Sequence, residues 1–453
     1  NTLTIMGTGR GKSAIFQSYA AEMALMRDQM TIIVYPLRAL VNDQYIGITK
    51  KLMAFDLNIY KGNGTLLTKE RAELFTALQF GKVDILLTTP EFLLAHLDFI
   101  SNTKRKIGFL VIDECHHIAD GAKRSAYKLL NTIINRLNHP KVLAVTATAD
   151  SKTVKCIKHT LSIKKIIIDK TVRENLMISD LRNMSDKIEE VNRIINKEEK
   201  VLVFVNSRMK AVEIASQLRE KNILMREKIA FYHAGLSNEW RVQIEDWFRN
   251  GEINVVVATS AFGEGIDLPD IRHIVLFHLP FDMVSFNQQC GRVGRDGIRG
   301  MIHLLYGKND ISFNQLILKE KAPIRDLIAR VYMNLKANLN NEQAITSTNE
   351  ELAKQIENRY HEAVSSASIS ICLRILEELG LIWRETFGNK RKIVFNPQPD
   401  QKLDLESSST FCEGIHVRAE FESFANFAMT ATSNRLLNCV NRPIYPLDEE
   451  TIM

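Results

Sequence analysis

The sequence predicts an α/β protein in which two tandem lobes, each built on a parallel sheet, are followed by a smaller helical domain. Short apolar runs alternate with longer amphipathic stretches as far as about residue 311, a pattern typical of parallel strands connected by helices. This rhythm restarts once, after a charged stretch at 180–200. At about 150 residues per domain, a chain of 453 residues also allows roughly three domains.

The composition excludes several classes of protein. With 45% hydrophobic and 25% charged residues, the chain is neither disordered nor collagen-like. No apolar run reaches the length of about 20 residues that crosses a bilayer, so no membrane partner is expected. The formal net charge of +6 is compatible with nucleic acid without indicating it.

Cysteine spacing argues against a structural zinc site. The six cysteines are Cys115, Cys156, Cys290, Cys372, Cys412 and Cys439. No two of them stand at CxxC spacing, so we expect no cysteine-rich zinc module. Scattered single cysteines are typical of a reduced, intracellular protein.

The apolar runs give the expected strands of the two lobes. In the first lobe we expect strands at 3–6, 31–35, 85–88, 109–112 and 142–145, with helices at 13–27 and 66–78. In the second lobe we expect strands at 201–205, 229–232, 255–258, 274–277 and 302–306. Nearly continuous apolar runs indicate strands that are buried on both faces. The lobes would join near 169–175.

The pattern becomes mainly helical after about residue 311. Serines open an expected helix at 365–379, and Gly380 stops it. Two apolar runs, 381–383 and 393–395, then flank a turn at 388–389. A helix followed by a basic ribbon is typical of a winged helix, although any small α+β domain fits equally well. The expected boundaries are 1–169, 170–318, 319–397 and a helical tail at 398–453.

A glycine-rich loop follows the first expected strand. It reads GTGRGKS and consists of Gly7, Thr8, Gly9, Arg10, Gly11, Lys12 and Ser13. Glycines let backbone N–H groups surround phosphates, and the helix that begins here adds its positive end. Lys12 would neutralise the β- and γ-phosphates, and the Ser13 hydroxyl would bind Mg²⁺. Met6 stands where the strict motif has glycine, so a glycine turn with a chance lysine is the alternative.

Two carboxylates follow the apolar run 109–112, namely Asp113 and Glu114. The carboxyl ends of parallel strands are where α/β sheets bind ligands. Asp113 would hold Mg²⁺ through water, and Glu114 would orient or activate the attacking water. His116 and His117 have no further ligands near them in sequence, so we do not expect them to bind a metal.

An ordered series of motifs resembles one known family. GTGRGKS is followed by YPLRALVNDQ at 35–44, TTPE at 88–91, DECH at 113–116 and TAT at 146–148. The second half continues with VFVNSR at 203–208, YHAGLSNEWR at 232–241, VVVATSAFGEGIDLPDIRHIV at 255–275 and QQCGRVGRDG at 288–297. The series resembles the motifs of superfamily 2 helicases, and of the RecQ family in particular. The resemblance implies two RecA-like lobes of the P-loop NTPase class, with ATP and Mg²⁺ as cofactors.

The resemblance also assigns roles to single residues. Arg292 and Arg295 would bring positive charge to the γ-phosphate when the lobes close. Gln288 would face the nucleotide, and Gly265 and Asp267 would lie in a loop that senses it. Contacts with the backbone of a bound strand are implied for Arg38, Thr89 and Thr259. Lys390, Arg391 and Lys392, at the tip of the basic ribbon, could bind duplex phosphates, with a solvated hairpin as the alternative.

The chain departs from the family at four places. The upstream glutamine motif that reads adenine is absent, and Asn1 stands only six residues before Gly7, so part of the first lobe is expected to lie upstream. The segment after DECH contains Lys123 and Arg124, with Tyr127 as its one aromatic residue, where the family has an aromatic-rich loop. The family's four-cysteine zinc module is missing. Glu264 replaces an expected methionine.

The expected function is an ATP-dependent DNA helicase that translocates 3′ to 5′ on single strands and unwinds duplex junctions in repair or recombination. Three alternatives stay open. The chain could remodel DNA or RNA without separating strands, it could be the helicase part of a larger nuclease-fused polypeptide, or it could be a non-enzymatic scaffold. A nuclease domain or another repair protein is the further partner considered. The expected location is the bacterial cytoplasm, at the nucleoid, or the eukaryotic nucleus.

Overall fold

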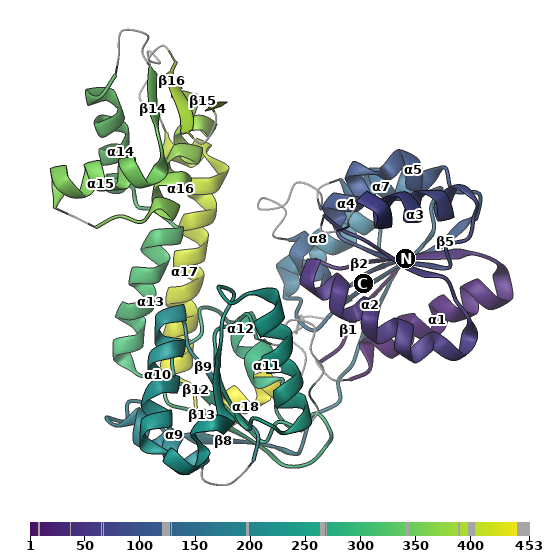
Figure 1. The fold of residues 1–453 in the computed structure, drawn as a ribbon, viewed down its shortest axis with the longest axis horizontal. Helices are drawn as coiled ribbons and strands as arrows, with labels where there is room; N and C mark the ends of the chain where they lie inside the picture. The colour runs from purple at the N-terminus through teal and green to yellow at the C-terminus, as the bar shows by residue number, and fades with distance from the viewer. Residues whose placement is uncertain are drawn as a thin grey trace. The chain divides into compact units, whose positions relative to one another are not determined.

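The computed structural model divides into two compact units (Figure 1). Unit 1 contains Asn1–Tyr306 together with Ala431–Met453, and unit 2 contains Gly307–Thr430. The structure describes residues 1–7, 10–36, 38–64, 66, 68–119, 127, 129–195, 199–262, 268, 270–339, 344–361, 363–387, 390–396 and 404–441. Unit 1 holds two α/β lobes, which confirms the predicted fold class for this part of the chain.

Lobe 1 is built on a seven-stranded parallel sheet in the order β3-β4-β2-β5-β6-β1-β7. Its strands are β1 (Thr2–Ile5), β2 (Met30–Val34), β3 (Ile59–Gly62), β4 (Ile85–Thr88), β5 (Ile107–Ile112), β6 (Lys141–Thr146) and β7 (Lys165–Ile168). Every residue of β2, β4 and β5 is buried, as expected for central strands of a sheet covered on both faces. The five predicted strands are all present, and β3 and β7 are added at the two edges.

Helices cover both faces of this sheet (Figure 1). Phe109 and Val111 of β5 pack with α1 and α2, whereas Leu110 and Ile112 point to the face covered by α3, α5, α7 and α8. This alternation follows from the two-residue period of a strand. The helices are α1 (Lys12–Arg27), α2 (Arg38–Leu52), α3 (Thr68–Gln79), α4 (Pro90–Ala95), α5 (Leu97–Ser101), α7 (Leu130–Arg136) and α8 (Ser151–Leu161), with short 3₁₀ turns η1 (Met53–Phe55) and η2 (Cys115–Ile118).

Lobe 2 repeats the plan with a six-stranded parallel sheet in the order β10-β11-β9-β12-β13-β8. Its strands are β8 (Leu176–Asp180), β9 (Val201–Phe204), β10 (Ile229–Tyr232), β11 (Val255–Ala258), β12 (His273–Leu276) and β13 (Gly300–Leu304). The helical segments are α9 (Lys187–Ile195), α10 (Arg208–Lys221), η3 (Ile223–Lys228), α11 (Asn238–Asn250) and α12 (Met283–Cys290). The connector, residues 169–175, runs from β7 to β8.

The last described helix, α18 (Ser433–Asn441), packs on lobe 2 against β8 and α12. Leu436 and Val440 of this helix are buried. The Asn287 side chain donates a hydrogen bond to the Cys439 carbonyl, and the Ser433 hydroxyl bonds the Asp180 carboxylate at 2.9 Å. The segment predicted as a tail, 398–453, is therefore divided between the two units, because its last described helix belongs to unit 1.

Unit 2 combines helices with a three-stranded antiparallel sheet in the order β14-β16-β15. Its elements are α13 (Lys308–Lys321), α14 (Arg325–Ala337), β14 (Ala344–Ser347), α15 (Asn349–Tyr360), α16 (Ser366–Glu378), β15 (Ile382–Phe387), β16 (Lys390–Phe395), η4 (Leu405–Ser407) and α17 (Ser409–Thr430). The order strand, helix, helix and hairpin is compatible with a winged helix, which stays a prediction. The predicted boundaries at 318 and 397 differ from the observed division, because α13 and α17 pack against each other and against α16.

The local signals around α16 are confirmed. The Ser365 hydroxyl accepts a hydrogen bond from the Ser368 amide at 3.2 Å, and Gly380 follows the helix with a φ of 70°. At the end of α16, the Glu378 carboxylate accepts hydrogen bonds from the Thr410 amide at 2.9 Å and the Ser408 hydroxyl at 2.7 Å. Burial acts to raise the pKa of Glu378, but hydrogen bonds from the Thr410 hydroxyl at 2.6 Å, from the Thr410 amide, from Ser408 and from Arg374 outweigh it and lower the pKa from 4.5 to about 2.

No helix in the described part of the chain is long and apolar enough to span a bilayer. Within the same residues, no group of three or more His, Cys, Asp and Glu side chains is placed to bind a metal ion. The six cysteines are unpaired thiols. The expectation of no structural zinc stays a prediction.

Candidate active site

The glycine-rich loop joins β1 to α1 at the carboxyl edge of the lobe 1 sheet. The Met6 amide donates to the Thr146 carbonyl at 2.8 Å, which fixes the start of the loop beside the end of β6. Gly11 caps α1 with a φ of 84°, a left-handed conformation that favours glycine. Because the capping residue has no side chain, the first N–H groups of α1 stay available to an anion. Thr8 and Gly9 lie outside the described residues.

Lys12 is the most informative residue of the loop. Its side chain is only 11% exposed, and its Nζ lies 3.6 Å from Glu114 Oε1. Within the described residues, this ammonium makes no hydrogen bond. A buried ammonium group has three donors to satisfy, and one long ion pair does not satisfy them. The site therefore fits a phosphate group at Lys12, as the sequence predicts.

The carboxylates Asp113 and Glu114 directly follow β5, a central strand of the sheet. The Asp113 amide donates to the Val34 carbonyl at 3.0 Å, and the Glu114 amide donates to Asp113 Oδ1 at 2.9 Å. Glu114 adopts a φ of 48°, a conformation that is unfavourable for a residue with a side chain. Such strain persists only where the surrounding contacts impose it, and here Glu114 contacts Lys12.

The two carboxyl groups have pKa values shifted in opposite directions. Burial, with the neighbouring charge of Glu114, raises the pKa of Asp113 from 3.8 to about 6. Burial also acts to raise the pKa of Glu114, but Lys12 and then His116 outweigh it and hold that pKa below its ordinary value. Glu114 is therefore an ionised acceptor at neutral pH. Asp113, beside the Lys12 charge and on the same edge as Ser13, has the oxygen donor type that Mg²⁺ prefers.

His116 links Glu114 to the end of β6. Its Nδ1 lies 3.3 Å from Glu114 Oε2 and 2.9 Å from the Thr146 hydroxyl oxygen. The Thr146 hydroxyl in turn bonds the Thr148 carbonyl at 2.9 Å. His116 thus contacts both the carboxylate of Glu114 and the hydroxyl of Thr146, and the sequence analysis assigned it no such position.

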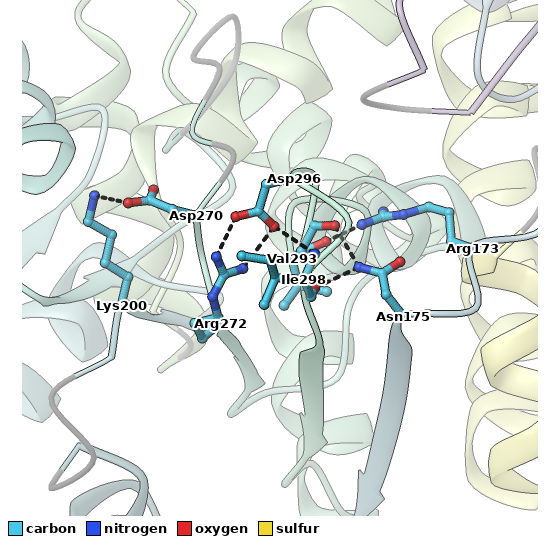
Figure 2. A network of polar contacts seen from close by, with 9 residues as sticks. Arg173, Asn175, Lys200, Asp270, Arg272, Val293, Asp296 and Ile298 are labelled. Carbon is cyan, nitrogen blue, oxygen red and sulfur yellow. Dashed lines mark hydrogen bonds and ion pairs between the residues drawn. The ribbon is translucent and has the colours of Figure 1, made fainter.

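The arginine loop, residues 291–298, follows α12 in lobe 2. It carries Arg292 and Arg295, and both are half-buried, as is Gln288 on the preceding helix. Arg295 Nε donates to the Gly291 carbonyl at 3.4 Å. Figure 2 shows that two residues near the end of the connector, Arg173 and Asn175, point toward the backbone of this loop. Sequence reasoning missed both, because nothing in their local pattern indicates carbonyl partners more than a hundred positions away.

The residues predicted to contact nucleic acid are less completely described. Thr89 is 2% exposed, and its hydroxyl caps α4 by accepting from the Phe92 amide at 3.3 Å, which leaves little surface for a strand. Thr259 is half-buried at the end of β11. Lys392 lies in β16 opposite Glu385. The predictions for Gly265, Asp267 and the side chains of Arg38, Lys390 and Arg391 fall outside the described residues.

Comparison with known families identifies both lobes. Residues 1–157 match the DEAD/DEAH box helicase family, and residues 186–297 match the helicase conserved C-terminal domain. The two matches cover the glycine-rich loop, the acidic pair and the arginine loop. They therefore agree with the grouping of these features in the two lobes.

Curated relatives extend the comparison to most of the motor. The probable ATP-dependent DNA helicase RecS of Bacillus subtilis is 29% identical over 339 residues, covering 73% of this chain and 66% of its own length. The ATP-dependent DNA helicase RecQ of Pasteurella multocida is 30% identical over 327 residues, covering 71% and 50%. RecQ of Bacillus subtilis is 31% identical over 330 residues, covering 71% and 53%. The chain thus spans between half and two thirds of these relatives.

Solved structures support the fold. Helicase Lhr of Mycobacterium smegmatis, bound to single-stranded DNA and AMP-PNP, aligns with a TM-score of 0.54 at 19% identity, covering 88% of this chain and 56% of that one. Dbp5 of S. cerevisiae, bound to RNA and ADP BeF3, aligns with a TM-score of 0.55 at 19% identity, covering 70% and 82%. With its paired RecA-like lobes, its ordered motifs and these relatives, the chain belongs to the superfamily 2 helicases and is a RecQ-like member of them.

Proposed function

We propose that the chain is an ATP-dependent DNA helicase that couples ATP hydrolysis to 3′ to 5′ movement on single-stranded DNA and to duplex unwinding. The observation that carries the proposal is the buried pairing of Lys12 with Glu114, at a helix N-terminus that is open to an anion. The curated relatives described above, which align with 73% and 71% of this chain, are named ATP-dependent DNA helicases, RecS as a probable one.

The chain's own residues divide the work of phosphoryl transfer. Lys12 and the first amides of α1 bind the β- and γ-phosphates. Glu114, ionised and in contact with His116, accepts a hydrogen bond from the attacking water. Ser13 and Asp113 would hold Mg²⁺, which neutralises charge on the phosphates when it is bound. Arg292 and Arg295 supply the charge that stabilises the transition state.

Contacts with DNA are proposed to be mainly electrostatic. A motor that moves along any sequence must grip phosphates, because phosphate contacts carry no sequence information. Lhr, which shares the fold, was solved with single-stranded DNA. Arg38 and Thr259 are the proposed contacts in the lobes, whereas the buried Thr89 caps α4. The ribbon β15–β16 with Lys390, Arg391 and Lys392 is the proposed contact for duplex DNA.

The test compares ATP hydrolysis with strand separation. Hydrolysis is measured with Mg²⁺ and ATP in the presence of single-stranded DNA, duplex DNA or RNA, and unwinding is measured on duplexes with a 3′ or a 5′ tail. We expect the strongest stimulation by single-stranded DNA and unwinding of the 3′-tailed duplex alone. If the full-length gene product unwinds neither duplex, or only the 5′-tailed one, the proposal is wrong.

A second candidate is a translocase that hydrolyses ATP on nucleic acid without separating strands. Tyr127, the one aromatic residue in the segment after DECH, is fully buried in the core of lobe 1. It therefore cannot stack on a base, which is the usual way aromatic side chains hold a single strand. DNA-stimulated hydrolysis without unwinding on the same substrates would favour this candidate, and stimulation by RNA alone would favour an RNA substrate.

The setting of the activity is also a proposal. Given its similarity to RecQ and RecS, we propose a role in DNA repair or recombination, at the bacterial nucleoid or in the eukaryotic nucleus. A nuclease domain or another repair protein is the proposed partner. Co-purification of the full-length product with its associated proteins tests both statements, since the absence of DNA-repair proteins would count against them.

A further inference from the structure

The connector holds the backbone of the arginine loop through side chains that donate to its carbonyl groups (Figure 2). Arg173 donates from Nη1 to the Gly291 carbonyl at 3.1 Å and from Nη2 to the Val293 carbonyl. Asn175 Nδ2 lies 2.7 Å from the carbonyl oxygens of both Gly294 and Ile298. Two side chains thus bind four carbonyl groups of a single eight-residue loop.

Further contacts fix the same loop from lobe 2 itself. Arg272 forms a bidentate ion pair with Asp296, one arm of which measures 3.0 Å, and Asp296 also accepts from the Ile298 amide at 3.1 Å. The Gly294 amide donates to the Ile271 carbonyl at 2.9 Å. The Gly294 and Ile298 amides are thus bonded and the Asp296 side chain is anchored, so Arg292 and Arg295 project from a loop that is held at several points.

Arg173 occupies a position that is electrostatically unfavourable for a cation. Burial, followed by the charges of Arg295 and Arg10, lowers the pKa of Arg173 to about 10. The guanidinium is still charged at neutral pH, so each of its hydrogen bonds to a carbonyl is charge-assisted and stronger than a neutral one. Because two of its terminal nitrogens are bonded to the loop backbone, Arg173 is arranged to hold the loop rather than to bind a phosphate.

We propose that Arg173 and Asn175 are positioning residues that hold the arginine loop in the conformation that Arg292 and Arg295 need for ATP hydrolysis. The proposal rests on the proposed ATPase function and adds to it a mechanical link. The connector leaves lobe 1 directly after β7, and Arg10 of the phosphate-binding loop donates to the Thr171 carbonyl at 3.3 Å. A hydrogen-bonded path therefore runs from the phosphate-binding loop through the connector to the arginine loop.

The test uses two conservative substitutions that break the hydrogen bonds to the loop carbonyls while nearly keeping the size of the side chain. Arg173→Lys keeps the positive charge, but a single ammonium cannot reproduce the planar fork that reaches two carbonyl groups. Asn175→Asp is nearly isosteric, and a carboxylate cannot donate to a carbonyl. Arg219→Lys is the matched control, because Arg219 also donates twice to a backbone carbonyl in lobe 2, that of Ile229, away from the arginine loop.

The first readout is steady-state ATP hydrolysis with single-stranded DNA. For Arg173→Lys and Asn175→Asp we expect kcat to fall at least about tenfold while KM for ATP changes less than about threefold, since the lost contacts act on the transition state. Arg219→Lys is expected to keep kcat within about twofold of the unsubstituted protein. Equal kcat values in all three variants would overturn the proposal.

The second readout does not depend on activity. Amide hydrogen exchange of residues 291–300, measured without nucleotide, is expected to be faster in Arg173→Lys and Asn175→Asp than in Arg219→Lys. Unchanged exchange would overturn the positioning role even if hydrolysis fell. If the unsubstituted protein hydrolyses no ATP, the proposed function fails, and exchange alone then decides whether the two residues hold the loop. Should one variant fail to fold, the other decides.

Discussion

Replacement of Gly294 by alanine tests the geometry of the arginine loop most directly. Gly294 has a φ of 55°, and a Cβ added to it would lie 2.7 Å from Asn175 Nδ2 and 2.7 Å from the Ile298 carbonyl oxygen. Both distances are too short for a carbon atom, so the side chain of Asn175 must move. Gly297, three positions on, has a φ of 84°, but a Cβ there would meet no described atom within 4 Å. Gly297→Ala is therefore a control that also places a side chain in the left-handed region but has no clash.

The expected losses of stability follow from the backbone strain and from the clash with Asn175. A side chain in the left-handed region costs about 1–2 kcal/mol of folding free energy, which both variants lose. Gly294→Ala also breaks the two hydrogen bonds of Asn175 to the loop, each worth about 1 kcal/mol. We therefore expect Gly294→Ala to destabilise lobe 2 by about 2 kcal/mol more than the control does. For a lobe of this size the difference lowers Tm by about a further 4–8 °C.

Thermal unfolding and ATP hydrolysis are measured on both variants. Because the clash displaces the backbone that carries Arg295, Gly294→Ala is expected to lower kcat at least about tenfold relative to Gly297→Ala. Adding Asn175→Ala to Gly294→Ala should cost less stability than Asn175→Ala does alone, since the two bonds are already broken. If the two glycine variants lose the same stability and the same activity, the assignment of the clash is refuted.

Three further substitutions and one ligand removal complete the predictions. Lys12→Ala should abolish turnover, with kcat reduced at least about 10²-fold and an unchanged circular dichroism spectrum, and retained hydrolysis would refute the nucleotide site. Chelation of Mg²⁺ by EDTA should stop hydrolysis, and excess Mg²⁺ should restore it. Because the pKa of Glu378 is lowered to about 2, its contribution to stability is present above pH 4.5 and lost as the pH falls toward 2. Glu378→Gln should therefore destabilise unit 2 toward unfolding by urea at pH 7 but not near pH 2. Glu357 is exposed, so the control Glu357→Gln should have no effect at either pH. Leu436→Ala should lower the free energy of unfolding of lobe 2 by about 2–5 kcal/mol, measured by thermal unfolding. Leu437 is only half-buried, so Leu437→Ala should lower it clearly less.

The central strands were predictable because burial on both faces leaves a simple signal. The expected strands at 85–88 and 255–258 match the interior strands β4 and β11. Strand β10 lies at an edge of its sheet but is buried at three of its four residues, and it was predicted as well. Edge strands carry a weaker signal, because only part of each is buried. In β7 the residues alternate between exposed and half-buried, and in β8 only Leu176 is buried, so neither strand was expected. Sequence periodicity therefore describes the middle of each sheet better than its edges.

The residues of the candidate site also fall into a group that the sequence predicted and a group that it did not. Lys12 and Glu114 were predictable because each belongs to a short motif at the end of a strand, and the structure brings them within 3.6 Å. His116 was assigned no role, since its partners Glu114 and Thr146 come together only when β5 and β6 pair. Arg173 and Asn175 could not be recognised, because their partners are backbone carbonyls, which every residue has. Long-range contacts with the backbone leave no local trace in a sequence.

The docking of α18 has a consequence for how the chain folds during synthesis. Strand β8 forms one edge of lobe 2, and the helix that packs against it is separated from the rest of the lobe by the whole of unit 2. A ribosome therefore releases residues 170–306 well before the residues that cover this edge. During that interval the surface on which Leu436 and Val440 pack is uncovered, and exposed apolar surface favours association with other chains. Nascent lobe 2 should accordingly depend most on chaperones in the period between the synthesis of β13 and that of α18.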